Sequence, residues 1–194
     1  IASAVQAAVP GAQVTTVRDY TNALDGFAIE APGSALSAIQ KVQGVKVAFI
    51  EGVHKPLETS ANGAVTPVLK NASSLAMTRA AEASQKGDRQ VIEVIDSGLQ
   101  TDHDAFAGSM DGVDVRLSQS DVQAFASKLP HGSSGTYVNS KIPFAYDYAD
   151  NDADVVPHSE KDLSHGTHVT AIAAANADVL QGTAPHAQIV VAKV

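Results

Sequence analysis

The sequence contains no cysteine in its 194 residues. Disulfide bonds, thiol catalysis and cysteine-ligated zinc are therefore excluded within this stretch. Basic residues are also scarce, with 13 lysines and arginines against 21 aspartates and glutamates, and the formal net charge is −8. An acidic chain lacks the basic patches that bind phosphate groups, so we expect no nucleic-acid partner and no attachment to an anionic membrane surface.

Long apolar runs are missing too. No run of about 18 consecutive apolar residues is present, so we expect no membrane span in this chain. No basic stretch followed by an apolar one opens the sequence, as a signal peptide would. The hydrophobic content of 44% is enough for one sizeable core or two small ones. Most of the excess acid falls from residue 88 onward, and this shift in charge indicates two modules.

The first module is expected over residues 1–58. Residues 13–18 alternate in polarity like a strand, and residues 27–31 predict a second strand. A helix is expected from residue 34 to about residue 42, followed by a third strand over 45–50. This order predicts a small α/β sandwich of the ferredoxin-like kind. Such a topology serves many roles, so it does not define a function by itself.

The second module is expected to be part of a doubly wound, parallel α/β domain. Residues 59–87 contain Gly63, Pro67 and several Ser, Thr and Asn residues, which predicts a linker and the start of this domain. From residue 88 to residue 194 the expected elements alternate between strands and helices, which favours parallel pairing. They are strands at 91–95, 144–148 and from about 188, with helices near 120–128 and from 165.

Two residues at the ends of these elements predict a reactive site. The apolar run Val91–Ile95 ends on Asp96, and such a strand delivers a carboxylate to the edge of the sheet where open α/β folds bind ligands. Ser164 can cap the helix that begins at His165. An acid followed by a histidine matches two members of a nucleophilic triad, in which the acid orients the imidazole and the imidazole transfers protons. The alternatives are an aspartate that caps a turn and a surface histidine.

These motifs resemble those of the subtilisin-like serine proteases, or subtilases. Val94–Gly98, followed by His103 and Phe106, is similar to the aspartate motif of the family, and His165–His168 is similar to its histidine motif. Gly182–Val194 resembles the segment that leads into the next strand of the family's sheet. The order of acid, base and serine is that of the family template.

A narrower resemblance lies between the two motifs. Asp114–Ser118, Asn139–Phe144 and Tyr146–Asp150 are similar to the matching region of lactocepin-type cell-envelope proteinases, which are large surface-anchored enzymes of Gram-positive bacteria. This resemblance implies a secreted or cell-surface location.

The family resemblance implies a role for each motif. Asp96 would be the orienting carboxylate and His165 the general base, while His103 belongs to the aspartate motif without a catalytic role. Residues 1–58 would be the inhibitory propeptide, which assists folding and blocks the active site until the linker is cut. The expected partners are polypeptide substrates and the chain's own propeptide as an intramolecular inhibitor.

The sequence departs from the family in one respect. A serine motif of the form Gly-Thr-Ser-Met-Ala does not occur in it, and the oxyanion-hole asparagine is expected beyond Val194. We therefore expect the N-terminal part of a longer precursor, which is inactive by itself and prone to self-associate through an unpaired edge strand. Two alternatives stay open: a propeptide-type protease inhibitor or chaperone module, and a pseudoenzyme that lacks the serine.

No cofactor is expected. His165 and His168 share one helix face, so a zinc site is geometrically possible, but the spacing fixes no third ligand. The zincin pattern needs histidines four residues apart with a glutamate. The acidic run 147–154 offers oxygen ligands for calcium, yet its spacing does not match an EF-hand loop.

Overall fold

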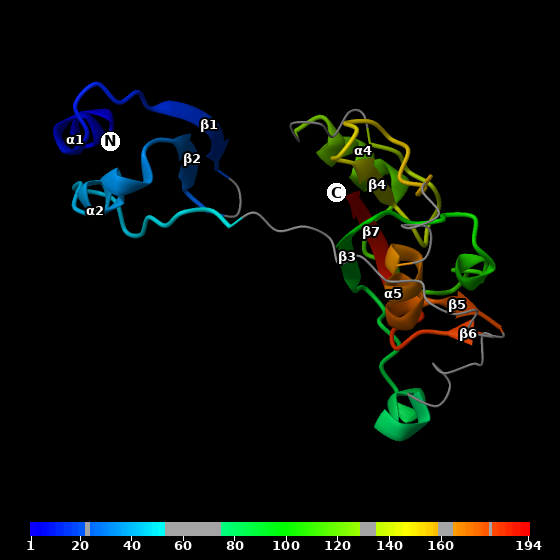
Figure 1. The fold of residues 1–194 in the computed structure, drawn as a ribbon. Coiled ribbons are helices and arrows are strands. Elements are labelled where there is room, and N and C mark those ends of the chain that lie inside the picture. Colours follow the sequence, from blue (N-terminus) through cyan, green and yellow to red (C-terminus); the bar gives the residue numbers. More distant parts are fainter. Residues whose placement is uncertain (22–23, 53–74, 129–134, 159–164, 179) are drawn as a thin grey trace. The chain divides into compact units, whose positions relative to one another are not determined.

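The computed structural model describes residues 1–21, 24–52, 75–128, 135–158, 165–178 and 180–194. The chain divides into two compact units, Ile1–Lys55 and Pro56–Val194, and Figure 1 shows the elements of both. Most of the predicted linker lies outside the described residues, as does the segment in which cleavage was expected. The domain bounds inferred from the sequence stay a prediction.

The first unit is built from a hairpin and short helices. Strands β1 (Thr15–Tyr20) and β2 (Gly26–Glu30) pair in an antiparallel manner, as the alternation of the sequence predicts. The helical segments in the described part of this unit are α1 (Ala2–Ala8), the 3-10 turn η1 (Gly33–Ala35) and α2 (Leu36–Ile39). Helix α1 contacts both η1 and α2, so a small helical layer holds Val5 and Ala35, which are fully buried.

The strand predicted over residues 45–50 does not form. These residues have no regular secondary structure, and the side chains of Val47, Phe49 and Ile50 are between 70% and 76% exposed. An alternating pattern sets which side chains share a face, but a strand also needs a neighbour for its backbone groups. In the described part of the unit, this segment pairs with neither β1 nor β2, so the prediction was wrong.

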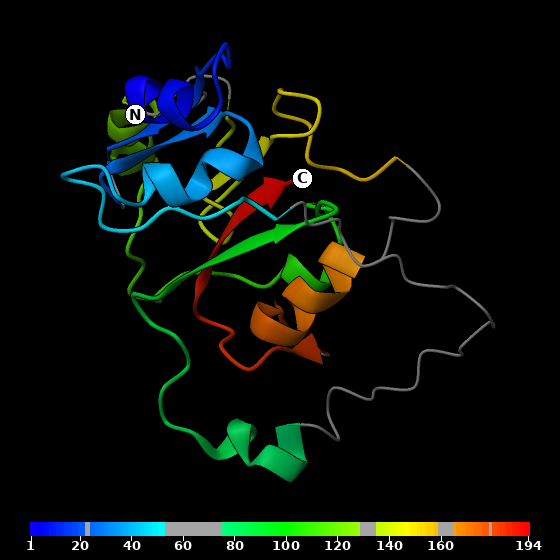
Figure 2. The same cartoon turned by 60° about the vertical axis from the view of Figure 1, so that its left-hand side comes forward.

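The second unit contains a three-stranded parallel sheet. Its strands are β3 (Val91–Asp96), β4 (Phe144–Asp147) and β7 (Gln188–Lys193), arranged in the order β3-β7-β4. Both pairings are parallel, which confirms the expected α/β class. Figure 2 shows β3 and β7 running side by side toward the same end of the sheet. All three strands coincide with apolar runs that the sequence made visible.

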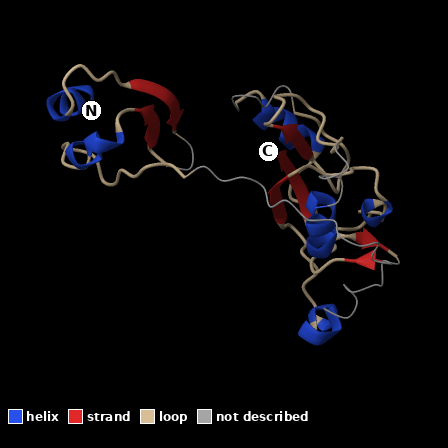
Figure 3. Ribbon diagram, viewed as in Figure 1, coloured by secondary structure: helices blue, strands red, loops and turns tan. Residues whose placement is uncertain are grey.

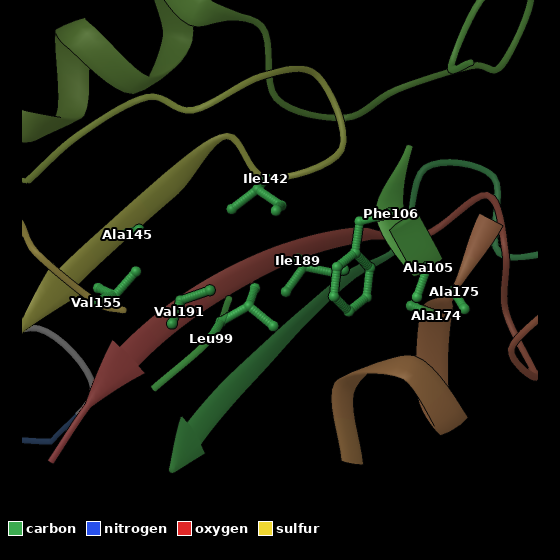
Figure 4. Close-up of a cluster of buried hydrophobic side chains, with 10 residues drawn as sticks. All are labelled: Leu99, Ala105, Phe106, Ile142, Ala145, Val155, Ala174, Ala175, Ile189 and Val191. Atoms are coloured by element: carbon green, nitrogen blue, oxygen red, sulfur yellow. The ribbon is translucent and has the colours of Figure 1, made fainter. Parts of the chain in front are cut away.

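Helix α5 (His165–Ala174) contacts β3 and β7 and covers one face of the sheet. Its Gly166 and Ala174 are buried and small, which lets the helix axis approach the strands closely. Under this helix and the adjoining loops lies a cluster of apolar side chains (Figure 4), consisting of Leu99, Ala105, Phe106, Ile142, Ala145, Val155, Ala174, Ala175, Ile189 and Val191.

The remaining elements of this unit are short (Figure 3). Ser118 caps α4 (Gln119–Ala126) in a reciprocal capping box with Asp121, which explains where this predicted helix begins. The others are η2 (Ala80–Glu82), η3 (Asp104–Phe106) and an antiparallel hairpin of β5 (Asn176–Ala177) and β6 (Leu180–Gln181).

Strand β3 lies at an edge of the described sheet, and Ile95 on this strand is 62% exposed. Within the described residues, no helix has the length and apolar composition needed to cross a membrane.

Candidate active site

The two residues that the sequence singled out lie in contact. Asp96 is the last residue of β3 and His165 the first residue of α5, 69 positions later. The Nδ1 atom of His165 is 2.8 Å from Oδ1 and 2.9 Å from Oδ2 of Asp96. An ionised carboxylate only accepts hydrogen bonds, so Nδ1–H is the donor and the lone pair of the neutral ring lies on Nε2. Their roles in catalysis stay a prediction.

The carboxylate of Asp96 is held in the ionised form. Burial raises the pKa of Asp96, but hydrogen bonds from His165 and from the backbone and hydroxyl of Ser97 together outweigh it and lower the pKa below its ordinary value of 3.8. The Ser97 amide donates to Oδ1 at 2.7 Å. The side chains of His165 and Asp96 are 25% and 16% exposed, so a molecule in solution can reach the imidazole.

The first turn of α5 is locked to the turn that follows Asp96. Gly98 adopts a φ of +116°, which favours glycine. Gly166 passes so close that a methyl group there would collide with the carbonyl oxygen of Gly98. The hydroxyl of Thr167 accepts a hydrogen bond of 3.0 Å from the backbone amide of Gln100. These contacts set the distance between the strand end and the helix, and therefore between the carboxylate and the imidazole.

The sequence did not predict these contacts between the first turn of α5 and the turn after Asp96. Gly166 and Thr167 were visible only as residues of the first helical turn, and their partners lie 67 or more positions away in the chain. The usable signal was the placement of a glycine and a small hydroxyl residue directly after His165. The cap proposed for Ser164 lies outside the described residues.

The other two histidines of the motifs have different surroundings. His168 is exposed, one turn along α5 from His165. His103 accepts a hydrogen bond of 3.1 Å at Nδ1 from the amide of Ala105, and so caps η3. Its ring centroid lies 6.3 Å from that of Phe106. His103 therefore has a structural function at the start of η3.

Metal ligands are not assembled in the part of the chain that the structure describes, where no group of three or more His, Cys, Asp or Glu side chains could hold an ion. In the acidic run, Asp147 is fully buried and accepts hydrogen bonds at Oδ1 from the amides of Ala149 and Asp150. Its Oδ2 lies 2.7 Å from Nζ of Lys193. The first carboxylate of the run is thus engaged by the protein itself.

Comparison with known proteins identifies the family. The model of the subtilase family matches residues 87–194. A PII-type proteinase of Lactococcus lactis subsp. cremoris is 32% identical over 98% of this chain and 10% of its own length, and one of Lacticaseibacillus paracasei is 30% identical over the same shares. A C5a peptidase of Streptococcus pyogenes serotype M3 is 31% identical over 58% of the chain and 10% of its own length.

The chain therefore spans about a tenth of the length of the curated relatives that it matches. These relatives agree with the resemblance to bacterial proteinases that the motifs indicated. Because the family model covers more than half of the residues and includes both Asp96 and His165, the chain belongs to the subtilase family.

Proposed function

We propose that the protein carrying this chain is a subtilisin-like serine endopeptidase, and that Asp96 and His165 supply its acid–base pair. The observation that carries this proposal is the 2.8 Å contact between Nδ1 of His165 and Oδ1 of Asp96, at the carboxyl end of a parallel strand. With Nδ1–H held by Asp96, Nε2 takes the proton of a serine hydroxyl and returns it to the leaving amine, while the carboxylate stabilises the imidazolium.

The nucleophile belongs to another part of the protein. Peptide hydrolysis through an acyl-enzyme needs a serine in a Gly-Thr-Ser context and an oxyanion donor, and this sequence contains no Gly-Thr-Ser segment. The 194 residues alone are therefore proposed to be inactive toward peptides. Purified chain incubated with casein and a peptide ester should release no product, and turnover that survives further purification contradicts this point.

The first unit is proposed to act as the propeptide-type inhibitor of the second. This proposal is supported by the division into two compact units and by relatives whose similarity extends over 98% of the chain, including the first unit. The proposed location is the cell surface of a Gram-positive bacterium, since the matched proteins come from Lactococcus, Lacticaseibacillus and Streptococcus. The proposed substrates are polypeptides.

A test uses the full-length protein with three classes of inhibitor. Casein hydrolysis should be abolished by a sulfonyl fluoride that sulfonylates the serine hydroxyl, and should survive both a metal chelator and a thiol reagent. A peptide of residues 1–58 should inhibit the same hydrolysis. Proteolysis that resists the sulfonyl fluoride but stops with the chelator would overturn the serine mechanism. Full activity in the presence of excess peptide would overturn the role of the first unit.

A further inference from the structure

Three charged residues form a row across the carboxyl end of the parallel sheet. Asp96 of β3 is in register with Lys193 of β7, and Lys193 is in register with Asp147 of β4. Neighbouring strands of a sheet lie about 4.8 Å apart, so the three Cα atoms follow one another at that spacing. At the carboxyl end of the sheet, the positively charged Lys193 therefore lies between two negatively charged aspartates on the neighbouring strands.

The three side chains share one face of the sheet. Ile189 and Val191 of β7 belong to the apolar cluster, and they pair in register with Ile92 and Val94, which pack against the same cluster. Since side chains alternate along a strand, the residues two positions further on, Asp96 and Lys193, point to this same face. On β4, Ala145 belongs to the cluster, which puts Asp147 there as well.

The charged end of Lys193 is fixed by Asp147. The ammonium lies 2.7 Å from Oδ2 of Asp147 and 3.8 Å from Oδ2 of Asp150, and the Lys193 side chain is only 13% exposed. Burial lowers the pKa of Lys193, but the contact with Asp147 and the charges of Asp150 and Asp154 outweigh it, so its pKa is raised and it stays charged. Asp147 is in turn oriented by two backbone amides.

The stem of Lys193 lies close to the turn that follows Asp96. A methyl group built on Gly98 would collide with the backbone carbonyl oxygen of Val155 and would lie 3.2 Å from Cδ of Lys193. The carbonyl oxygen of Gly98 also lies where a methyl group on Gly166, next to His165, would be. The lysine stem and the first turn of α5 therefore both lie close to Gly98, and the ammonium of the lysine is held by Asp147.

We propose that Lys193, anchored by Asp147, is a positioning residue that supports the turn 96–98 and so sets the hydrogen bond between Asp96 and His165. This inference rests on the proposed function only in giving that hydrogen bond a catalytic purpose. Loss of the anchor frees the lysine stem, lets the turn move against α5, and loosens the hydrogen bond. A positional effect on catalysis lowers kcat more than it changes KM.

The test follows the proton on Nδ1 of His165 by NMR in the histidine-labelled chain. Lys193→Met keeps the stem and removes the charge, and its expected result is loss of the low-field Nδ1–H resonance, which Lys193→Arg restores. The control is Arg89→Met, which breaks an exposed ion pair with Asp114 just before the other end of β3 and should leave the resonance unchanged. In the full-length protein, Lys193→Met should lower kcat about tenfold at unchanged KM, a size typical of small misplacements.

Lys193→Met leaves the carboxylate of Asp147 buried without a cation, so this variant could lose the resonance simply because it does not fold. A second variant is therefore needed. The double variant Lys193→Met, Asp147→Asn removes both charges, and it should fold yet still lose the resonance. The variant Asp96→Asn distinguishes a failure of the proposed function from a failure of the positioning inference. If Asp96→Asn leaves the resonance in place, the pair itself and the proposed function are contradicted. If Asp96→Asn abolishes it while the folded double variant keeps it as in the unmodified chain, only the positioning inference is overturned.

Discussion

At the scale of single residues, this protein keeps charged groups inside its core by giving each a specific partner. Asp147 is fully buried, and burial raises its pKa, but the contact with Lys193 and the amides of Asp150 and Ala149 outweigh this and lower its pKa. Lys141 is 2% exposed and donates to the backbone carbonyls of Pro185 at 2.7 Å and Ala187 at 2.6 Å. The pKa values of both side chains are lowered in the folded chain, so each group makes the chain more stable as pH rises, Asp147 in the acid range and Lys141 in the basic range.

Asp147 predicts a loss of stability in acid. Its pKa is lower in the folded chain than in the unfolded chain, so its contribution is complete above the ordinary value of 3.8 and is lost as pH falls through the folded value. The free energy of unfolding, measured with urea between about pH 5 and pH 2, should fall more steeply for the unmodified chain than for Asp147→Asn. Parallel curves for the two proteins would contradict this assignment.

Lys141 predicts a gain of stability in base. Burial lowers its pKa from 10.5 to about 8, so between these values the folded chain has released a proton that the unfolded chain still binds. Relative to Lys141→Met, the free energy of unfolding should rise by about 1–3 kcal/mol from pH 8 to pH 10. The reference variant cancels the other groups that titrate in this range. A difference between the proteins that stays constant with pH would show that Lys141 does not titrate there.

At the scale of elements, the pairing of β3 with α5 decides the geometry of the site. The helix begins on His165, and its next residue, Gly166, is the point of closest approach to the turn after β3. Protein interiors are closely packed, so a single additional methyl group at such a point must displace the helix or the turn. The separation of Asp96 and His165 therefore depends on a residue that is not a member of the pair.

Gly166→Ala tests this dependence. The added methyl group should cost about 1–3 kcal/mol of unfolding free energy, which is typical of overpacking, and should weaken or remove the Nδ1–H resonance of His165. Gly33→Ala is the matched control, because a methyl group at Gly33 meets only Cδ1 of Ile50, at an ordinary distance of 3.6 Å. A Gly166→Ala chain with unchanged stability and an unchanged resonance would show that the close approach of Gly166 to Gly98 does not set the distance between Asp96 and His165.

Some helices and strands could be predicted from the sequence, and others could not. Strands β3, β4 and β7 and helix α5 were predictable because each contains a short stretch of mainly apolar residues. The segment 45–50 has the same kind of pattern and remains without secondary structure, because the pattern does not specify a pairing partner. Helix α1 and the hairpin β5–β6 were not predicted, since both are short and neither has a strong periodic pattern.

The candidate site was predictable in part for the same reason. Asp96 and His165 stand in motifs, so their residue types and order were visible. The alignment of Asp96, Lys193 and Asp147 depends on the order of the strands in the sheet and on their register. Neither can be deduced from a local sequence pattern. The order β3-β7-β4 puts the last strand of the chain between the two earlier ones, so Lys193 reaches the site from the far end of the sequence.

At the scale of the whole molecule, the two units differ in how much core they build. Among the described residues of the first unit, only Val5 and Ala35 are buried apolar residues, whereas the second unit encloses a cluster of ten. The chain has no disulfide to compensate for the small core. Since buried apolar area supplies most of the stability of a domain, the first unit should be the less stable one.

Hydrogen exchange of the intact chain tests this difference. Backbone amides of β1 and β2 should exchange much faster than those of β3 and β7, because opening of a small unit requires less free energy. The comparison is internal, with all four strands in one sample, so pH and temperature cancel. Equal protection of both pairs of strands would contradict the prediction and would show that the first unit derives stability from something other than its own core.

The most direct measurement is casein hydrolysis by the full-length protein and three of its variants. Asp96→Asn should lower kcat on the order of 10⁴-fold, the loss that a wrong imidazole tautomer causes in serine-protease triads, and His165→Ala should do at least as much. His168→Ala, on the exposed side of the same helix, should hydrolyse casein like the unmodified protein. If Asp96→Asn or His165→Ala retains near-normal hydrolysis, these two residues are not the acid–base pair of the enzyme.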